Sequence, residues 1–154
     1  MNAIGVKMVK SEAMTRGDYN KYRGWENPVN EDPEDKGFLV RYADGYESWC
    51  PDKQFKTANL FIHGSNIVTK ADVRGFIKSQ EILTIGDRTT FVRVVLRNGF
   101  SIEETNSCVD VANYDEVIGT EICMEKIYDK IWDYLGFVLC WATKGLTMVD
   151  ETTH

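Results

Sequence analysis

Residues 89–104 read TTFVRVVLRNGFSIEE, and this stretch decides the fold of the second half of the chain. Eight β-forming residues precede Asn98-Gly99, the favoured two-residue turn of a β-hairpin. Such a turn sets the register and pairs Arg93 with Glu104 across the two strands. Both faces of the hairpin then carry apolar residues. We therefore expect a helix on one face and another layer, or a second subunit, on the other.

A long amphipathic helix is predicted after this hairpin. Asn113 is a good N-cap with Glu116 three residues later, and the helical pattern continues to about Thr143. Ile118 and Ile122 project away from the main apolar stripe, so we expect this helix to contribute to a homo-oligomer interface. The stripe itself has spacings of three and four residues and consists of Met124, Ile127, Tyr128, Ile131, Leu135, Val138, Leu139 and Ala142.

The first half of the chain predicts a strand, a helix, an acidic loop, a hairpin and a second helix. Thr15 is the expected N-cap of the first helix, which ends at Gly24. The expected ranges are 5–14 for the strand, 26–36 for the loop, 38–42 and 46–50 for the hairpin strands, and 51–60 for the second helix.

A boundary is expected near residues 63–66, where periodicity is lost. Thr69 and Asp72 then resemble a capping box, opening a helix that has Val73, Phe76 and Ile77 on one face. The sequence thus predicts an α+β fold with an N-terminal strand, helix and hairpin lobe, followed by an antiparallel β-hairpin packed on a long C-terminal α-helix. The expected domains are residues 1–64 and 65–154.

Composition and charge exclude several classes of function. The chain has 154 residues and a net charge of −6, which argues against nonspecific nucleic-acid binding. No apolar run approaches a membrane span, so we expect a cytoplasmic protein with no membrane partner. The four cysteines form no CxxC pair, and His63 is accompanied only by the terminal His154. We therefore expect reduced thiols, no metal, no cofactor and no catalytic residues.

The predicted ligand-binding residues are Phe91, Arg93, Phe100 and Asn113. Arg93 suits a phosphate or carboxylate, the two phenylalanines suit a stacked base, and Asn113 would open the long helix, whose first backbone amides favour anions. Two structural alternatives stay open. Arg93 can instead form a cross-strand ion pair with Glu104, and Asn113 can be a simple helix cap.

Several motifs resemble the gene-49 and gene-66 family of small tailed-phage proteins. The family typically has a threonine-rich strand, an Asn-Gly-Phe turn, Ser-Ala-Cys, Asp-Pro-Ala-Asn-Phe-Asp and a Gly-containing helix. The resemblance covers about residues 66–142. Its motifs here are TTFVRVVLRNGF at 89–100, SCVDVANYDEVIG at 107–119, IYDKIW at 127–132 and LGFVL at 135–139.

The first half resembles a module found in many small prophage proteins, over about residues 5–60. The matching motifs are MTRGDYNKYRGW at 14–25, GFLV at 37–40 and DGYESW at 44–49.

The resemblance implies a non-enzymatic phage or prophage accessory protein that acts in the host cytoplasm. The expected role is to counter bacterial immunity, either by sequestering a nucleotide-derived signal or by masking a host defence protein. Suspected relatives grip phosphates with paired arginines on the long helix, but residues 119–124 here contain no arginine. The alternative is a regulatory or structural phage protein that binds a basic protein partner.

Overall fold

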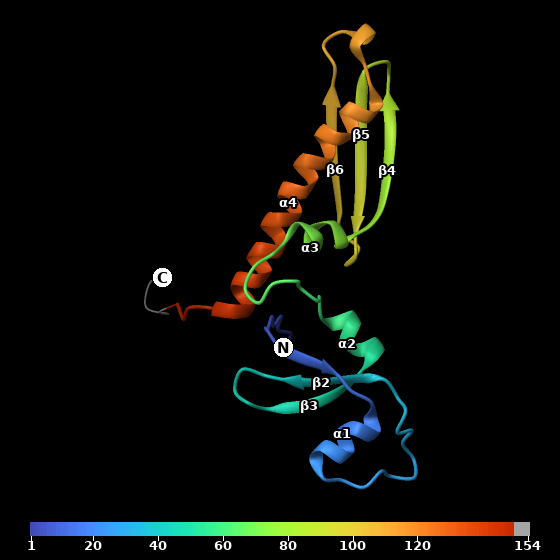
Figure 1. The fold of residues 1–154 in the computed structure, drawn as a ribbon. Helices are drawn as coiled ribbons and strands as arrows, with labels where there is room; N and C mark the ends of the chain where they lie inside the picture. The colour runs from blue at the N-terminus through green and yellow to red at the C-terminus, as the bar shows by residue number, and fades with distance from the viewer. Residues whose placement is uncertain (150–154) are drawn as a thin grey trace. The chain divides into compact units, whose positions relative to one another are not determined.

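The computed structural model describes residues 1–149 and shows an α+β protein with two compact units (Figure 1). One unit contains residues 1–61 and the described residues from 141 onward, and the other contains residues 62–140. Each unit has a three-stranded antiparallel sheet. The expected domain division between residues 64 and 65 stays a prediction.

The first unit is built as its local sequence signals predict. Thr15 caps α1 and Gly24 ends it in the left-handed conformation at φ 73°. The expected first strand is confirmed but is shorter than 5–14, and the loop 26–36 contains no helix or strand. The elements are β1 (Lys10–Ala13), α1 (Arg16–Arg23), β2 (Gly37–Arg41), β3 (Glu47–Pro51) and α2 (Asp52–Ala58), with the strands in the order β1-β2-β3.

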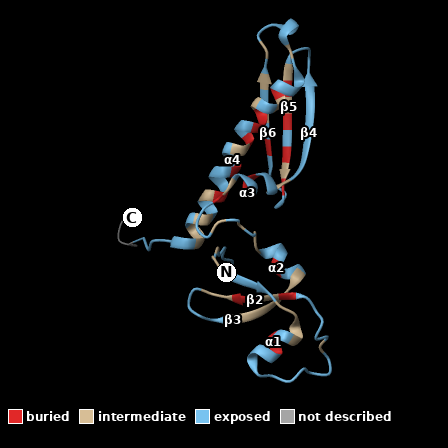
Figure 2. Ribbon diagram, in the orientation of Figure 1, coloured by how far each residue is buried: buried red, intermediate tan, exposed pale blue. Residues whose placement is uncertain are grey.

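The second unit places one face of its sheet against the long helix. Its elements are α3 (Lys70–Gly75), β4 (Ile77–Ile85), β5 (Thr89–Leu96), β6 (Ser101–Ser107), the short 3-10 turn η1 (Val111–Asn113) and α4 (Glu116–Lys144). The strand order is β4-β5-β6. Figure 2 shows the buried residues along β5 and along α4. The core includes Val92, Val94, Leu96 and Ile102 from the sheet, Cys123, Met124, Ile127, Ile131 and Leu135 from α4, and Val68 and Val73 at α3.

The expected register of the β5–β6 hairpin is wrong by one residue. Leu96 pairs with Phe100 through its backbone N–H (2.7 Å), and Arg93 lies opposite Glu103 rather than Glu104. The loop is therefore 97–99, with Gly99 at φ 88°. Asn-Gly also suits this three-residue loop, in which a turn is followed by a left-handed glycine. The one-residue shift places the apolar residues Val92 and Ile102 on the same face.

Two other boundaries differ from the expectation. The helix that opens at Thr69 ends at Gly75, and Ile77 begins the strand β4, which the sequence did not predict. The long helix begins at Glu116 rather than Asn113. Asp115 caps it by accepting hydrogen bonds from the backbone N–H groups of Val117 (2.8 Å) and Ile118 (3.2 Å).

Candidate functional site

Two of the four predicted ligand residues, Phe91 and Arg93, lie together on β5. The Arg93 guanidinium lies 5.6 Å from the centroid of the Phe91 ring. It also forms ion pairs with Glu103 (2.9 Å) and Glu81 (3.8 Å), on the strands to either side. Two carboxylates therefore compete with any anion for this arginine.

The other two predicted residues lie apart from this pair. Phe100 follows the loop between β5 and β6 and packs edge-on against Tyr134 of α4, with ring centroids 5.9 Å apart. Asn113 is in η1, beyond the opposite end of β6, and is separated from Phe100 by the full length of that strand. The structure does not bring the four residues into one site, and their role in ligand binding stays a prediction.

A groove of about 700 Å³ in the second unit combines more functional groups. α3 forms one wall, α4 forms the other, and β4 contributes Gln80. The lining residues are Lys70, Val73, Arg74, Gln80, Thr120, Glu121, Met124, Glu125, Tyr128, Asp129 and Trp132. Its volume falls within the usual range for small-molecule sites.

A capping box fixes the α3 wall of the groove. Thr69 Oγ1 accepts a hydrogen bond from the backbone N–H of Asp72, and Asp72 Oδ2 accepts one from the backbone N–H of Thr69 (2.7 Å). Asp72 Oδ1 contacts Nδ1 of His63 at 2.5 Å and accepts from the His63 backbone N–H at 3.0 Å. Burial alone would raise the pKa of Asp72, but these hydrogen bonds outweigh it and lower the pKa to about 2. Asp72 is therefore a carboxylate at neutral pH and holds the start of α3 in place.

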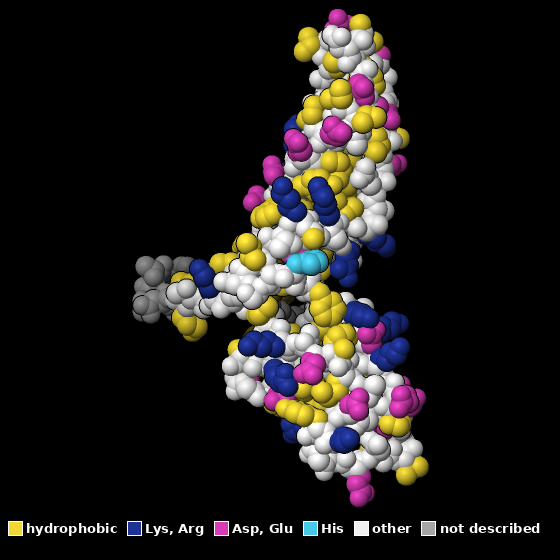
Figure 3. Space-filling model, in the orientation of Figure 1, with side chains coloured by type: hydrophobic (Ala, Val, Ile, Leu, Met, Phe, Trp, Pro, Cys, Tyr) yellow, Lys and Arg dark blue, Asp and Glu magenta, His cyan; other side chains and the backbone are white. Residues whose placement is uncertain are grey.

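The cations of the groove come from α3, and its aromatic rings and carboxylates come from α4. Lys70 and Arg74 come from α3, and the Arg74 guanidinium lies 5.8 Å from the centroid of the Tyr128 ring on α4. Trp132, one turn further along α4, is 39% exposed. Figure 3 shows dark-blue side chains beside a yellow patch over α3 and α4, with magenta side chains along α4. The carboxylates of the groove are Glu121, Glu125 and Asp129.

This arrangement suits a ligand that has a flat ring, an anionic group and hydrogen-bond donors. An aromatic side chain stacks on a base, and guanidinium and ammonium groups bind phosphate. Carboxylates accept hydrogen bonds from amino groups of a base or from ribose hydroxyls.

The sequence does not predict the groove, because the walls of the groove lie far apart in the chain. Tyr128 was assigned to the apolar stripe of the long helix, and Lys70 and Arg74 were not selected. One signal was present: Lys70 and Arg74, like Tyr128 and Trp132, are four residues apart and share one helix face.

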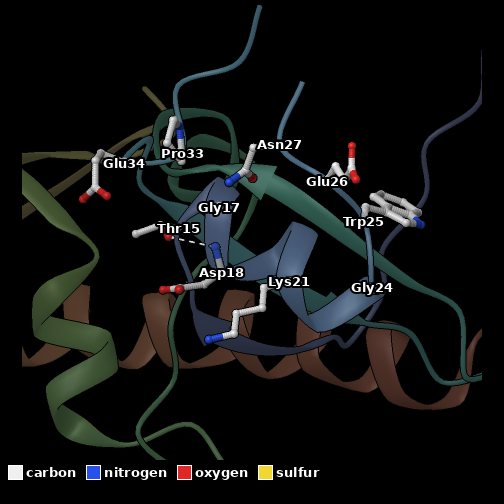
Figure 4. A pocket seen from close by; sticks show the side chains of 10 residues that line it. All are labelled: Thr15, Gly17, Asp18, Lys21, Gly24, Trp25, Glu26, Asn27, Pro33 and Glu34. Atoms are coloured by element: carbon white, nitrogen blue, oxygen red, sulfur yellow. Dashed lines mark hydrogen bonds between the residues drawn. The ribbon is translucent and has the colours of Figure 1, made fainter. Parts of the chain in front are cut away.

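A second pocket, of about 610 Å³, lies in the first unit between α1 and the acidic loop. Figure 4 shows Thr15 capping α1 through the backbone N–H of Asp18 (3.2 Å), with Trp25 at the edge of the pocket. The carboxylates of Asp18, Glu26 and Glu34 point in different directions in this view. They do not converge on one ligand, so the groove of the second unit is the better candidate site.

Residues 1–149 lack two further features, a metal-binding cluster and a membrane-spanning helix. Within that range, no three His, Cys, Asp or Glu side chains gather closely enough to hold a metal ion. None of the helices there has the length and apolar character needed to cross a membrane.

Comparison with known proteins gives a match over part of the second half of the chain. Residues 68–142 match the model of a family described as "Phage protein (N4 Gp49/phage Sf6 gene 66) family". No curated protein and no solved structure matches the chain. Nothing identifies the N-terminal module, whereas every residue that lines the groove lies within the matched segment.

Proposed function

We propose that this protein, whose residues 68–142 belong to that phage family, counters bacterial immunity by capturing a nucleotide-derived signal in the groove between α3 and α4. Its action is non-enzymatic, because sequestration requires only tight binding. The observation that carries the proposal is the Arg74–Tyr128 pair, which sets a cation beside an aromatic ring in a groove of ligand size.

Different side chains of the groove bind different parts of the ligand. Lys70 and Arg74 bind the phosphates, and Trp132 or Tyr128 stacks on the base. Glu121 and Glu125 accept hydrogen bonds from the base or the ribose. Carboxylates repel phosphate, so their placement on α4 orients the ligand with its phosphates toward α3.

A thermal-shift assay of the full chain tests this proposal directly. The probes are a cyclic dinucleotide, a linear dinucleotide, a mononucleotide and the matching nucleoside. A ligand present at a hundred times its Kd stabilises the folded state by about 2.7 kcal/mol, which corresponds to a rise in Tm of about 5–10 °C for a chain of this size. We expect a rise with at least one phosphate-containing probe and a smaller rise with the nucleoside.

Paired variants locate the site. Arg74→Ala should weaken binding roughly tenfold to a hundredfold, because it removes a charge-assisted contact. Arg93→Ala is the matched control and should bind normally. Trp132→Ala should weaken binding, whereas Tyr134→Ala, also a half-exposed ring on α4, should not. If no probe raises the Tm, nucleotide capture is wrong, and loss of binding in Arg93→Ala alone would place the site on β5.

A second candidate function is regulation or assembly through a basic protein partner. The pocket of the first unit favours it, because Asp18, Glu26 and Glu34 face solvent there against one cation, Lys21. Titration with an oligolysine peptide at low and high salt tests this candidate, since such binding must weaken as salt screens the charges.

A further inference from the structure

β4 has one unpaired edge in the described structure. It pairs with β5 on one side only, because the strand order of the sheet is β4-β5-β6. Ile77 is half-buried, and every later residue of this nine-residue strand is exposed. Unpaired backbone N–H and C=O groups on such an edge are a template for another strand.

The edge also lacks most of the features that prevent pairing. The strand contains no proline, and its only bulge, at Ile77/Ser79, lies at its beginning. From Ser79 to Ile85 the strand is regular. Three apolar side chains on this part are substantially exposed: Ile82 at 38%, Leu83 at 47% and Ile85 at 53%. A regular, partly apolar edge of this kind favours pairing.

The two ends of the edge carry opposite charges. Lys78 lies at the beginning of β4, four residues after Arg74 and eight residues after Lys70 of α3. Asp87 follows the other end, where Glu116 also bonds to Thr84 Oγ1 (2.5 Å). Arg88 keeps its positive charge while its guanidinium donates to the Val109 carbonyl (3.0 Å), but the two carboxylates of Asp87 and Glu116 outnumber it at this end. The edge is therefore basic at its start and acidic at its finish.

We propose that a second copy of this chain pairs with β4 through this edge, in the antiparallel direction, to form a six-stranded sheet. Antiparallel pairing of two identical edges places the basic end of each beside the acidic end of the other. A purely basic or purely acidic peptide would match only one end. The charge pattern therefore selects a second copy as the occupant.

The register of this pairing follows from the two-fold symmetry of the dimer. Residues that lie directly opposite across a two-fold axis must face the same side of the sheet. Centring the pair on Ile82 satisfies this condition and buries Ile82 against the partner's Ile82. It sets Glu81 beside the partner's Leu83 instead of against its own copy, and Lys78 beside the partner's Gly86, next to the partner's Asp87.

Charge exchange tests the dimer on the full chain. Light scattering of the unsubstituted protein at micromolar concentration should give twice the 17.6 kDa chain mass. Lys78→Glu and Asp87→Lys each place like charges at both symmetric contacts, so each should weaken the dimer roughly tenfold. An equimolar mixture of the two variants restores opposite charges at both contacts and should form a heterodimer, detected by native mass spectrometry.

Two control variants identify the surface. Lys53→Glu makes the same charge change on α2 and should leave the dimer intact. Ile118→Glu tests the exposed helix position that the sequence assigned to an interface. Monomeric unsubstituted protein, failure of the mixture to pair, or dissociation by Ile118→Glu alone would each overturn the proposal.

Cysteine cross-linking tests the register without depending on charge. Ile82→Cys places two thiols opposite each other at a Cα separation suited to a disulfide, so oxidation should give a covalent dimer. Leu83→Cys thiols are offset along the strands and should cross-link poorly, and the unsubstituted chain measures the background from the native cysteines. Equal cross-linking by the two variants would refute the register. Circular dichroism confirms that each variant is folded.

Discussion

The two sheets have the same number and direction of strands, and both units have an apolar core, but the first unit adds a cluster of polar contacts around one of its loops. In the first unit, hydrogen bonds and an ion pair tie the loop 26–36 to α1. In the second unit, apolar side chains hold the sheet against α4. In the first unit β2 also packs on α2, where the centroids of the Phe38 and Phe55 rings lie 4.5 Å apart, so the polar contacts add to an apolar core and do not replace it.

The polar contacts of the first unit centre on Glu31. Arg16 donates to both of its carboxylate oxygens, at 2.8 and 3.0 Å. Asn20, which is only 2% exposed, donates to Glu31 at 3.0 Å and to Asn27 at 3.0 Å. The hydrogen bonds from Arg16 and Asn20 lower the pKa of Glu31, so the carboxylate stays charged. The acidic loop is thus held in place although it has no regular secondary structure.

The largest effect is expected in the apolar core of the second unit. Ile127 is fully buried, so Ile127→Ala should lower the free energy of unfolding by about 3 kcal/mol. Urea unfolding measures this loss, and hydrogen exchange should show that β5 loses more protection than β2. Ile118→Ala is the control on the same helix and should change stability by less than about 0.5 kcal/mol, because Ile118 is 55% exposed. Equal losses of unfolding free energy in the two variants would contradict the conclusion that apolar packing holds the sheet against α4.

Acid should destabilise the second unit by protonating Asp72, whose carboxylate makes the main polar contact of that unit. The pKa of Asp72 is about 2 in the folded state, below its ordinary value of 3.8. A lowered pKa contributes stability above pH 4, and this contribution is lost as the pH falls from about 4 to about 2. The loss should amount to about 2 kcal/mol. Between pH 4 and pH 2, the free energy of unfolding should fall less steeply with decreasing pH in Asp72→Asn than in the unsubstituted protein. An unchanged slope would show that another carboxylate dominates the acid response.

A smaller effect is expected in the first unit. Asn20→Ala removes two hydrogen bonds from a buried position and should lower stability by about 1 kcal/mol. The exposed Asn30 supplies the matched control, Asn30→Ala. Proteolysis should cut the loop 26–36 faster in Asn20→Ala than in the control. If both variants resist cleavage equally, the polar contacts do not hold the loop.

The sequence predicts most helices and strands correctly, because capping residues and apolar periodicity within each segment determine them. Thr15 and Gly24 bound α1 by capping, and an apolar period of three to four residues marks α4. β4 was missed because Lys78, Ser79, Gln80 and Glu81 show no apolar alternation. An exposed edge strand has no buried face to impose that pattern.

The hairpin register and the groove required information that no short stretch contains. Val94 and Val95 are both apolar, so the sequence does not decide which of them faces the core. Packing against α4 decides it. The groove depends on bringing Arg74 to Tyr128, which only the folded unit does. Its residues could be recognised as chemically suitable but not as neighbours.

The close approach of α4 to β5 means that positions 119 and 90, which are far apart in the sequence, should evolve together. A Cβ added at Gly119 would lie 2.1 Å from Thr90 Oγ1, and Thr90 is itself fully buried. Any larger residue at position 119 therefore requires a smaller one at position 90 or a displaced helix. Relatives that keep this packing should change the two positions together, as a compensating pair. Gly136, on the same helix, has nothing within 4 Å of an added Cβ and is free to vary alone.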